Sequence, residues 1–215
     1  MAYNELTANS IGFNLTGDGN IFDSNKVHGN RIGIALRSEK DANAHITLTK
    51  NQIWDNGKDI KRCEAGGSCV PNQRLGAIVF GVPALEHEGF VGSRGGGVVI
   101  DPKNLQKTCT TPDQQGCNAQ PNQWIQAPQL VARQGQLVVS FKGEENQRYR
   151  VEFFGNRNAQ SKEAEQFVGY ATVVTNAQGQ ATLTWKPTEK FANYTANITD
   201  HLGASSELSQ PVKLK

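Results

Sequence analysis

Aliphatic residues alternate with polar ones in the first part of the chain, and this alternation recurs in three copies. The copies begin at Asn4, Asn25 and Asn51, 21 and then 26 residues apart. Within a copy the aliphatic side chains occupy every second position, as at Ile32 and Ile34, which is the period of a β-strand with one buried face. A repeat of this length predicts stacked short strands rather than an ordinary globular domain.

Stacking the copies would place equivalent residues next to one another. We expect Val27 to pack between Leu6 and Ile53 in the interior, and on the next strand we expect Ile34 beside Ile60. Asparagine suits the corners because it tolerates left-handed backbone geometry and its amide can bond the next coil. These features predict a parallel β-helix with two asparagine ladders. The ladders are Asn4, Asn25 and Asn51, and Asn9, Asn30 and Asn56.

The second half of the chain has a different pattern. Seven short apolar or alternating runs, separated by turn signals such as those at 176–179 and 200–203, follow one another in about 87 residues. Strands at this spacing are typical of an Ig-like sandwich. We therefore predict an all-β protein in three parts. Residues 1–105 form parallel β-helix repeats with irregular final coils, residues 106–128 form a disulfide-bearing linker, and residues 129–215 form an Ig-like β-sandwich.

The four cysteines form two closely spaced pairs, Cys63 with Cys69 and Cys109 with Cys117. Each pair brackets a turn-rich loop with little core of its own, so we predict one stabilising disulfide within each pair. The alternatives are reduced buried thiols or a four-cysteine zinc site, although zinc ligands are typically only about two to four residues apart. Two local disulfides indicate an exported protein, either secreted, on the cell surface or periplasmic.

Composition excludes several classes of function. The 215 residues include 22 basic and 20 acidic side chains, a formal net charge of +2, and no basic block, so nucleic-acid binding is not predicted. The chain has no run of about 18 apolar residues, so we expect no membrane insertion. The first residues also lack the charged and apolar regions of a signal peptide.

Outward-facing residues of the stacked copies are the candidates for chemistry. One set is suggestive, because His28 and Trp54 would share a face that could bind a sugar ring, with Asp55 beside them. The competing interpretation is a partly packed surface aromatic next to a solvated histidine. Glu-His-Glu at 86–88 could bind a cation or act in acid–base chemistry, but such a run is more often a solvated loop. We predict no metal, no cofactor and no recognisable catalytic motif.

The repeat pattern N-x-[IV]-x-x-N-x-x-G-[IF]-x-L resembles the right-handed parallel β-helix repeats of secreted bacterial proteins, among them pectate-lyase-like enzymes, periplasmic copper-associated proteins and surface adhesins. The stretches 122–130, 151–154 and 199–208 resemble the Ig-like domain that often follows such repeats. The resemblance implies the C-terminal part of a secreted right-handed β-helix protein followed by an Ig-like domain. It does not identify an activity, because the repeat residues build the scaffold.

The leading interpretation is therefore a non-enzymatic extracellular or cell-surface module. It would serve in adhesion, as a stalk, or in binding a glycan or a host or bacterial surface protein. Because the repeat begins at Asn4 without a capping segment, we expect either upstream β-helix coils of a longer protein or a partner that caps this end. The alternative is a polysaccharide-active lyase, hydrolase or epimerase whose catalytic coils lie mostly upstream. A third interpretation makes the sandwich a secretion or sorting signal.

Overall fold

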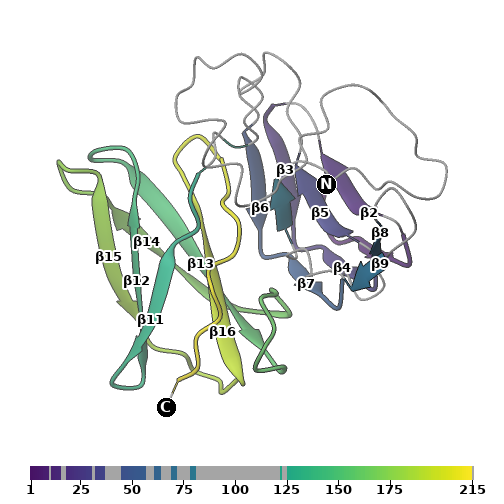
Figure 1. Cartoon of the computed structure of the whole chain (residues 1–215). Coiled ribbons are helices and arrows are strands. Elements are labelled where there is room, and N and C mark those ends of the chain that lie inside the picture. The colour runs from purple at the N-terminus through teal and green to yellow at the C-terminus, as the bar shows by residue number, and fades with distance from the viewer. Residues whose placement is uncertain are drawn as a thin grey trace.

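The computed structural model shows two parts side by side (Figure 1). The first part contains the N-terminus and is built of short strands, whereas the second is built of longer antiparallel strands. None of the described segments forms a helix with the length and hydrophobicity needed to cross a bilayer. The residues that the structure describes are 1–9, 11–15, 18–30, 32–36, 45–56, 61–63, 69–71, 78–80, 122 and 125–214.

Strands of the first part pair mainly in parallel. They are β1 (Glu5–Thr7), β2 (Ile11–Leu15), β3 (Asn20–Asp23), β4 (Lys26–His28), β5 (Ile32–Leu36), β6 (Ile46–Thr49), β7 (Gln52–Trp54), β8 (Lys61–Cys63), β9 (Cys69–Pro71) and β10 (Ile78–Phe80). One parallel sheet has the order β1-β4-β7, a second β10-β5-β2, and a third pairs β3 with β6. The β8–β9 hairpin is antiparallel. Strands of successive copies of the repeat therefore become neighbours in a sheet.

The register of the first sheet follows the repeat spacing. Val27 pairs with Leu6 on one side and with Ile53 on the other. Val27 and Ile53 are buried, as are Ile46 and Leu48 of the third sheet. Removing each such side chain from water stabilises the fold by about 1.5–3 kcal/mol, so the single aliphatic residues of the repeat supply its interior.

The second sheet differs from the expectation at one position. Ile34 is buried and pairs with Ile78 of β10, whereas the sequence suggested Ile60, which lies outside the described residues. The excursion that contains the β8–β9 hairpin separates β7 from β10 along the chain. An insertion of this kind moves the pairing residue away from the position that the repeat spacing gives.

An asparagine ladder crosses the three copies at the corner before β1, β4 and β7. The backbone N–H of Asn4 donates to Oδ1 of Asn25 (2.9 Å), and that of Asn25 donates to Oδ1 of Asn51 (2.9 Å). The left-handed φ falls on the residue before each asparagine. These residues are Tyr3 (58°), Ser24 (54°) and Lys50 (52°). Asparagine therefore serves at this corner through the hydrogen bonds of its amide. It does not adopt the left-handed backbone conformation on which the prediction was based.

The second part consists of two three-stranded antiparallel sheets, with orders β11-β12-β15 and β14-β13-β16. The strands are β11 (Gln129–Arg133), β12 (Gln136–Lys142), β13 (Arg148–Asn156), β14 (Gln166–Val174), β15 (Gln180–Trp185) and β16 (Asn193–Thr199). Side chains of both sheets form one buried cluster between them, which includes Leu137, Val139, Val151, Phe153 and Ile198. We refer to residues 125–214 as the sandwich.

Residues 207–214, predicted as a seventh strand, make an isolated bridge instead. Tyr194 and Val212 exchange two backbone hydrogen bonds of 2.8 and 2.9 Å. Pro211, which precedes Val212, has no N–H to donate to a longer ladder. The assignments to a right-handed parallel β-helix and an Ig-like sandwich, with the boundaries given above, stay predictions.

The sandwich turns the outer face of its β14-β13-β16 sheet toward the last strands of the first part. Phe153 enters the cluster inside the sandwich, whereas Phe154 enters the cluster of the first part. Ala164 and Leu208 join Phe154 there, packed with buried aliphatic residues such as Ile53. The two parts therefore share one apolar core where they meet.

Polar groups of the sandwich side also pair with the backbone of β6. The backbone N–H of Ile46 donates to Oδ1 of Asn122 (2.7 Å), and Nδ2 of Asn122 donates to the carbonyl oxygens of Ile46 (2.8 Å) and Ser205 (2.7 Å). The backbone N–H of Leu48 donates to Oγ of Ser205 (2.9 Å). These bonds satisfy the edge of β6 that faces away from β3.

A buried carboxylate completes this contact. Oε1 of Glu152 accepts from Oγ1 of Thr49 (2.7 Å) and from Nε of Arg150 (2.8 Å). Oε2 accepts from the backbone N–H of Lys50 (2.8 Å). The Glu152 side chain is only 1% exposed, so its charge is balanced by these donors and not by water.

Replacing Glu152 with alanine is expected to lower the free energy of unfolding by about 3 kcal/mol, because the substitution leaves Thr49, Lys50 and Arg150 without their shared acceptor. Urea denaturation followed by circular dichroism measures this loss. The exposed Glu145 provides the control, since Glu145→Ala is expected to change stability by less than about 0.5 kcal/mol. Equal stability of the two variants would contradict this account of the contact.

Candidate functional site

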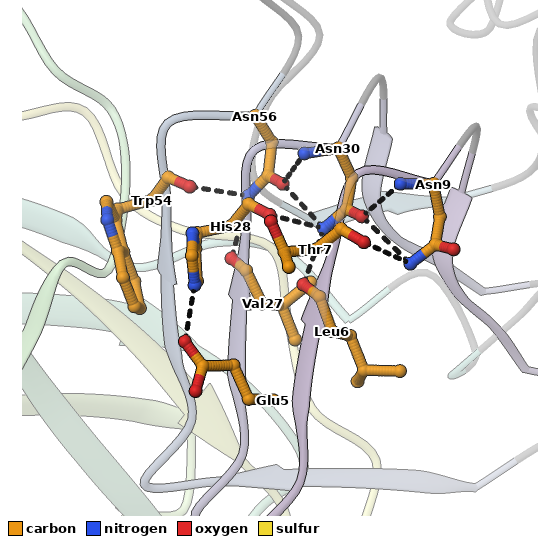
Figure 2. A network of polar contacts seen from close by, with 9 residues as sticks. All are labelled: Glu5, Leu6, Thr7, Asn9, Val27, His28, Asn30, Trp54 and Asn56. Atoms are coloured by element: carbon orange, nitrogen blue, oxygen red, sulfur yellow. Dashed lines mark hydrogen bonds and ion pairs between the residues drawn. The ribbon is translucent and has the colours of Figure 1, made fainter.

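Three chemically distinctive side chains gather on the outer face of the β1-β4-β7 sheet (Figure 2). Successive residues of a strand point to opposite faces, so the buried Val27 directs its neighbours Lys26 and His28 outward. In the parallel register, His28 pairs with Trp54 of β7. Glu5 of β1 belongs to the adjacent row, where it pairs with Lys26.

Glu5 reaches diagonally across this face to His28. Oε1 of Glu5 lies 2.8 Å from Nε2 of His28, with side-chain exposures of 60% and 24%. The hydrogen bond with His28 holds the pKa of the Glu5 carboxyl below its ordinary value, and the positive charges of His28 and Lys26 act in the same direction. An ionised carboxylate only accepts hydrogen bonds, so Nε2 carries the proton in this contact.

The indole of Trp54 packs against the imidazole of His28. The ring centroids of His28 and Trp54 are 4.3 Å apart with an interplanar angle of 15°, which is a stacked arrangement. With Nε2–H directed at Glu5, Nδ1 is the ring nitrogen that accepts a hydrogen bond or a proton whenever the imidazole is neutral. A histidine oriented by a carboxylate and held by a stacked ring is suited to take up and return a proton.

The second asparagine ladder supports the backbone of these three strands (Figure 2). The backbone N–H of Asn9 donates to Oδ1 of Asn30 (2.9 Å), and that of Asn30 donates to Oδ1 of Asn56 (3.0 Å). Nδ2 of Asn30 donates to the carbonyl oxygen of His28, and Nδ2 of Asn56 to that of Trp54, both at 3.0 Å. Each asparagine thus closes the corner that follows a strand of the site.

The structure brings together two of the three residues that the sequence suggested and adds a third, Glu5. His28 and Trp54 lie together, whereas Asp55 lies at the corner after Trp54, where its φ is 57°. Glu5 is an outward-facing residue of the first copy of the repeat, but only its diagonal contact with His28 reveals its role. The contact could have been predicted by looking for a carboxylate one row away from His28 on the neighbouring strand, because long side chains can reach diagonal neighbours in a sheet.

The chain holds a second histidine–carboxylate pair. His45 donates its backbone N–H to Oδ1 of Asp18, and its Nδ1 also lies 2.8 Å from that oxygen. These bonds, the backbone one first, hold the pKa of Asp18 below its ordinary value. This pair serves below as a control, because its histidine makes the same 2.8 Å contact with a carboxylate.

Other predicted positions give no site in the part of the chain that the structure describes. No group of three or more metal-ligating side chains is found there. Cys63 and Cys69 are register partners in the β8–β9 hairpin, whereas Cys109, Cys117 and residues 86–88 lie outside the described residues.

Comparison with known proteins finds a relative that is named as an enzyme. No family model matches the chain. The chain is 76% identical over 205 residues to a protein of Acinetobacter baylyi (strain ATCC 33305 / BD413 / ADP1) named 3-dehydroshikimate dehydratase. The match includes 95% of this chain and 42% of the relative, so the chain spans less than half the length of that protein.

This relative corrects the functional interpretation. A protein so similar over nearly the whole chain is named as an enzyme, so the prediction of a non-enzymatic adhesion, stalk or carbohydrate-binding module is wrong. The assignment to the C-terminal part of a secreted bacterial β-helix protein is wrong for the same reason. The repeat misled because its residues build strands and corners, which report on geometry and not on activity. The broader alternative, an enzyme, fits the finding better.

Location and partners are corrected by the same finding. The predicted secreted, cell-surface or periplasmic location came from the resemblance and from the cysteines, and a relative named 3-dehydroshikimate dehydratase does not support it. The predicted glycan or surface-protein partner, the upstream β-helix coils and a capping partner at the N-terminal end are likewise unsupported. An exported location can therefore no longer be used to support the predicted disulfides.

Removing Asn30 tests the ladder. Its Nδ2 donates to the carbonyl oxygens of Leu6 and His28 and to Oδ1 of Asn56, and its Oδ1 accepts two bonds from Asn9. Asn30→Ala is therefore expected to lower the free energy of unfolding by about 3 kcal/mol, and Asn9→Ala at the exposed end of the ladder by about 1 kcal/mol. Chemical denaturation of both variants measures the difference, and equal losses would contradict a buried ladder.

Titration of Glu5 tests the pair. Carbon-13 NMR of the carboxyl is expected to give a pKa below the ordinary 4.5, and His28→Ala is expected to return it toward that value while His45→Ala leaves it unchanged. Because the folded-state pKa is lowered, the contribution of the pair to stability is present above about pH 4.5 and is lost as the pH falls through the lowered pKa. A pKa that does not respond to His28→Ala would rule out the hydrogen bond as its cause.

Proposed function

We propose that this chain takes part in the dehydration of 3-dehydroshikimate, with Glu5 and His28 supplying acid–base catalysis. The observation that carries the proposal is the 76% identity over 205 residues to the relative of that name. The chain spans 42% of that relative, and the proposal extends the activity of the longer protein to it. The Glu5–His28 contact of 2.8 Å supports the assignment of the acid–base residues.

The reaction requires a base and an acid. The substrate carries a ring ketone, hydroxyl groups and a carboxylate. A base removes a proton from a carbon next to the ketone, the electron pair of that C–H bond forms a C=C bond, and the neighbouring C–O bond breaks. The departing hydroxide takes up a proton and leaves as water. In our proposal Nδ1 of His28 takes the first proton and returns it to the leaving oxygen, as one general acid–base group can do.

The neighbours of His28 suit this role. The pKa of Glu5 is lowered from an ordinary value that already lies well below neutral pH, so the carboxylate is ionised at neutral pH. Its charge stabilises the imidazolium that forms when His28 takes the proton. Lys26 is exposed and lies on the same outward row as Glu5, where its ammonium would attract the substrate carboxylate. Trp54, stacked on His28, restricts rotation of the imidazole and offers an apolar surface beside the substrate ring.

Turnover by substituted proteins tests the proposal. The protein as encoded in its gene is incubated with 3-dehydroshikimate, and the loss of one water is followed by mass spectrometry. His28→Gln is expected to lower kcat by about 100- to 10,000-fold, the usual contribution of a general acid–base group. His45→Gln removes a histidine with the same 2.8 Å carboxylate contact and is expected to keep full activity.

Two results would overturn the proposal. Absence of turnover by the unsubstituted protein would refute the dehydratase assignment for this chain. Full turnover by His28→Gln would leave the dehydratase assignment standing and would refute the acid–base roles that we give to Glu5 and His28.

A further inference from the structure

The β7 strand, which carries Trp54, is held from both sides. On one side it pairs with β4. On the other, the backbone of Ile53 exchanges two hydrogen bonds with Ala164 of the sandwich, N–H to O at 2.7 Å and O to N–H at 2.8 Å. Residues 161–164 therefore extend the sheet of the candidate site by one short antiparallel segment, which we call the docking segment.

The asparagine ladder also ends on the docking segment. In each copy the backbone N–H of an asparagine donates to Oδ1 of the next, first from Asn9 to Asn30 and then from Asn30 to Asn56. Asn56 has no following asparagine in the repeat, and its backbone N–H donates instead to Oε1 of Glu163 (3.3 Å). The carboxylate of Glu163 thus occupies the place that the amide of a further asparagine would take.

Glu163 is itself held in place. Oγ of Ser161 donates to its Oε2 (2.6 Å), and its carbonyl oxygen accepts from Nδ2 of Asn156 (2.9 Å) and from Oγ1 of Thr195 (2.5 Å). A carboxylate accepts hydrogen bonds without needing to donate one. A carboxylate can therefore end the ladder, whereas every inner asparagine must both accept a hydrogen bond from one neighbour and donate one to the next.

We propose that Glu163 is a positioning residue for the stacked pair of His28 and Trp54, acting through Asn56. Nδ2 of Asn56 donates to the carbonyl oxygens of Trp54 (3.0 Å) and Val27 (2.9 Å), so Asn56 ties together the strands that carry the two rings. Its own backbone is held by Glu163. The sandwich thereby sets the orientation of His28 through the backbone of Asn56. The catalytic consequence rests on the proposed function, whereas the structural one does not.

Loss of Glu163 would act on the corner between Trp54 and Asn56. Asp55 at this corner has a left-handed φ of 57°, a geometry that costs free energy in a non-glycine residue and persists when its surroundings enforce it. Without the bond from Glu163, the corner relaxes and the indole moves relative to the imidazole. Glu163→Gln keeps an acceptor oxygen and is expected to preserve the arrangement, whereas Glu163→Ala is not.

NMR of the histidine rings tests this without substrate. The chain has four histidines, and the signals of His28 are those that disappear in His28→Gln. In the unsubstituted protein the stacked indole is expected to shift the His28 ring protons upfield. Glu163→Ala is expected to move them toward the position of an unstacked histidine, and Glu163→Gln to restore them.

Glu165→Ala is the matched control. Glu165 lies two residues away and binds the backbone N–H and guanidinium of Arg157, so its loss is expected to leave the His28 signals unchanged. If Glu163→Ala does not fold, Ser161→Ala removes the hydroxyl that holds the Glu163 carboxylate and is expected to give a smaller shift in the same direction. His28 signals that stay in place in every folded variant at 161 and 163 would overturn the proposal.

Measuring kcat and KM tests whether the positioning of His28 by Glu163 affects catalysis. Glu163→Ala is expected to lower kcat by up to about 100-fold, as misplacement of a catalytic group by about 1 Å can do, with KM nearly unchanged and with rescue by Glu163→Gln. If the His28 signals move as expected and the unsubstituted protein has no dehydratase activity, the positioning role stands and the proposed function fails. If the His28 signals stay in place and the unsubstituted protein is active, the proposed function stands and the positioning role fails.

Discussion

The unpaired edge of the last parallel strands is the constraint on which this molecule depends. A strand at the edge of a sheet presents backbone N–H and C=O groups that must find partners. In this chain the sandwich provides most of them, since Ala164 pairs with Ile53, Ser205 binds the backbone of β6, and Glu152 accepts from Lys50. Asn122, which precedes the sandwich, also binds the backbone of β6. The sandwich thus acts on this edge as a further turn of strands would.

The chemistry of this contact explains why it can be specific. Phe154 and Leu208 supply apolar area to the shared core, but apolar contact is non-directional. The hydrogen bonds of Asn122 and Glu152 require defined positions of both partners, and an unsatisfied buried group costs about 1–3 kcal/mol. The apolar residues therefore favour association of the two parts, and the polar residues define their relative position. That position in turn brings Glu163 next to Asn56.

The repeat made part of this arrangement predictable. Because equivalent residues recur along the chain, the neighbours of Val27 and the members of both ladders could be written down before the strands were seen. The sequence did not reveal the contact of Glu5 with His28, because a diagonal between rows depends on side-chain length and on the rotamer. It also did not reveal Glu163 as the end of a ladder, since that residue lies 107 positions from Asn56 and follows no repeat. Activity was inaccessible for a different reason, because scaffold residues are shared by proteins that do unrelated chemistry.

The shared edge also bears on how such a chain can change during evolution. Domains joined by a flexible linker can be exchanged by recombination, because each keeps its own surface. Here an exchange of the sandwich would leave the edges of β6 and β7 without partners and would expose Phe154 and Leu208 on the separated half. A replacement would have to reproduce an alanine segment, a carboxylate and a serine in matching places at once. The two halves are therefore expected to be inherited together, and substitutions on either side of the contact should be accepted in pairs.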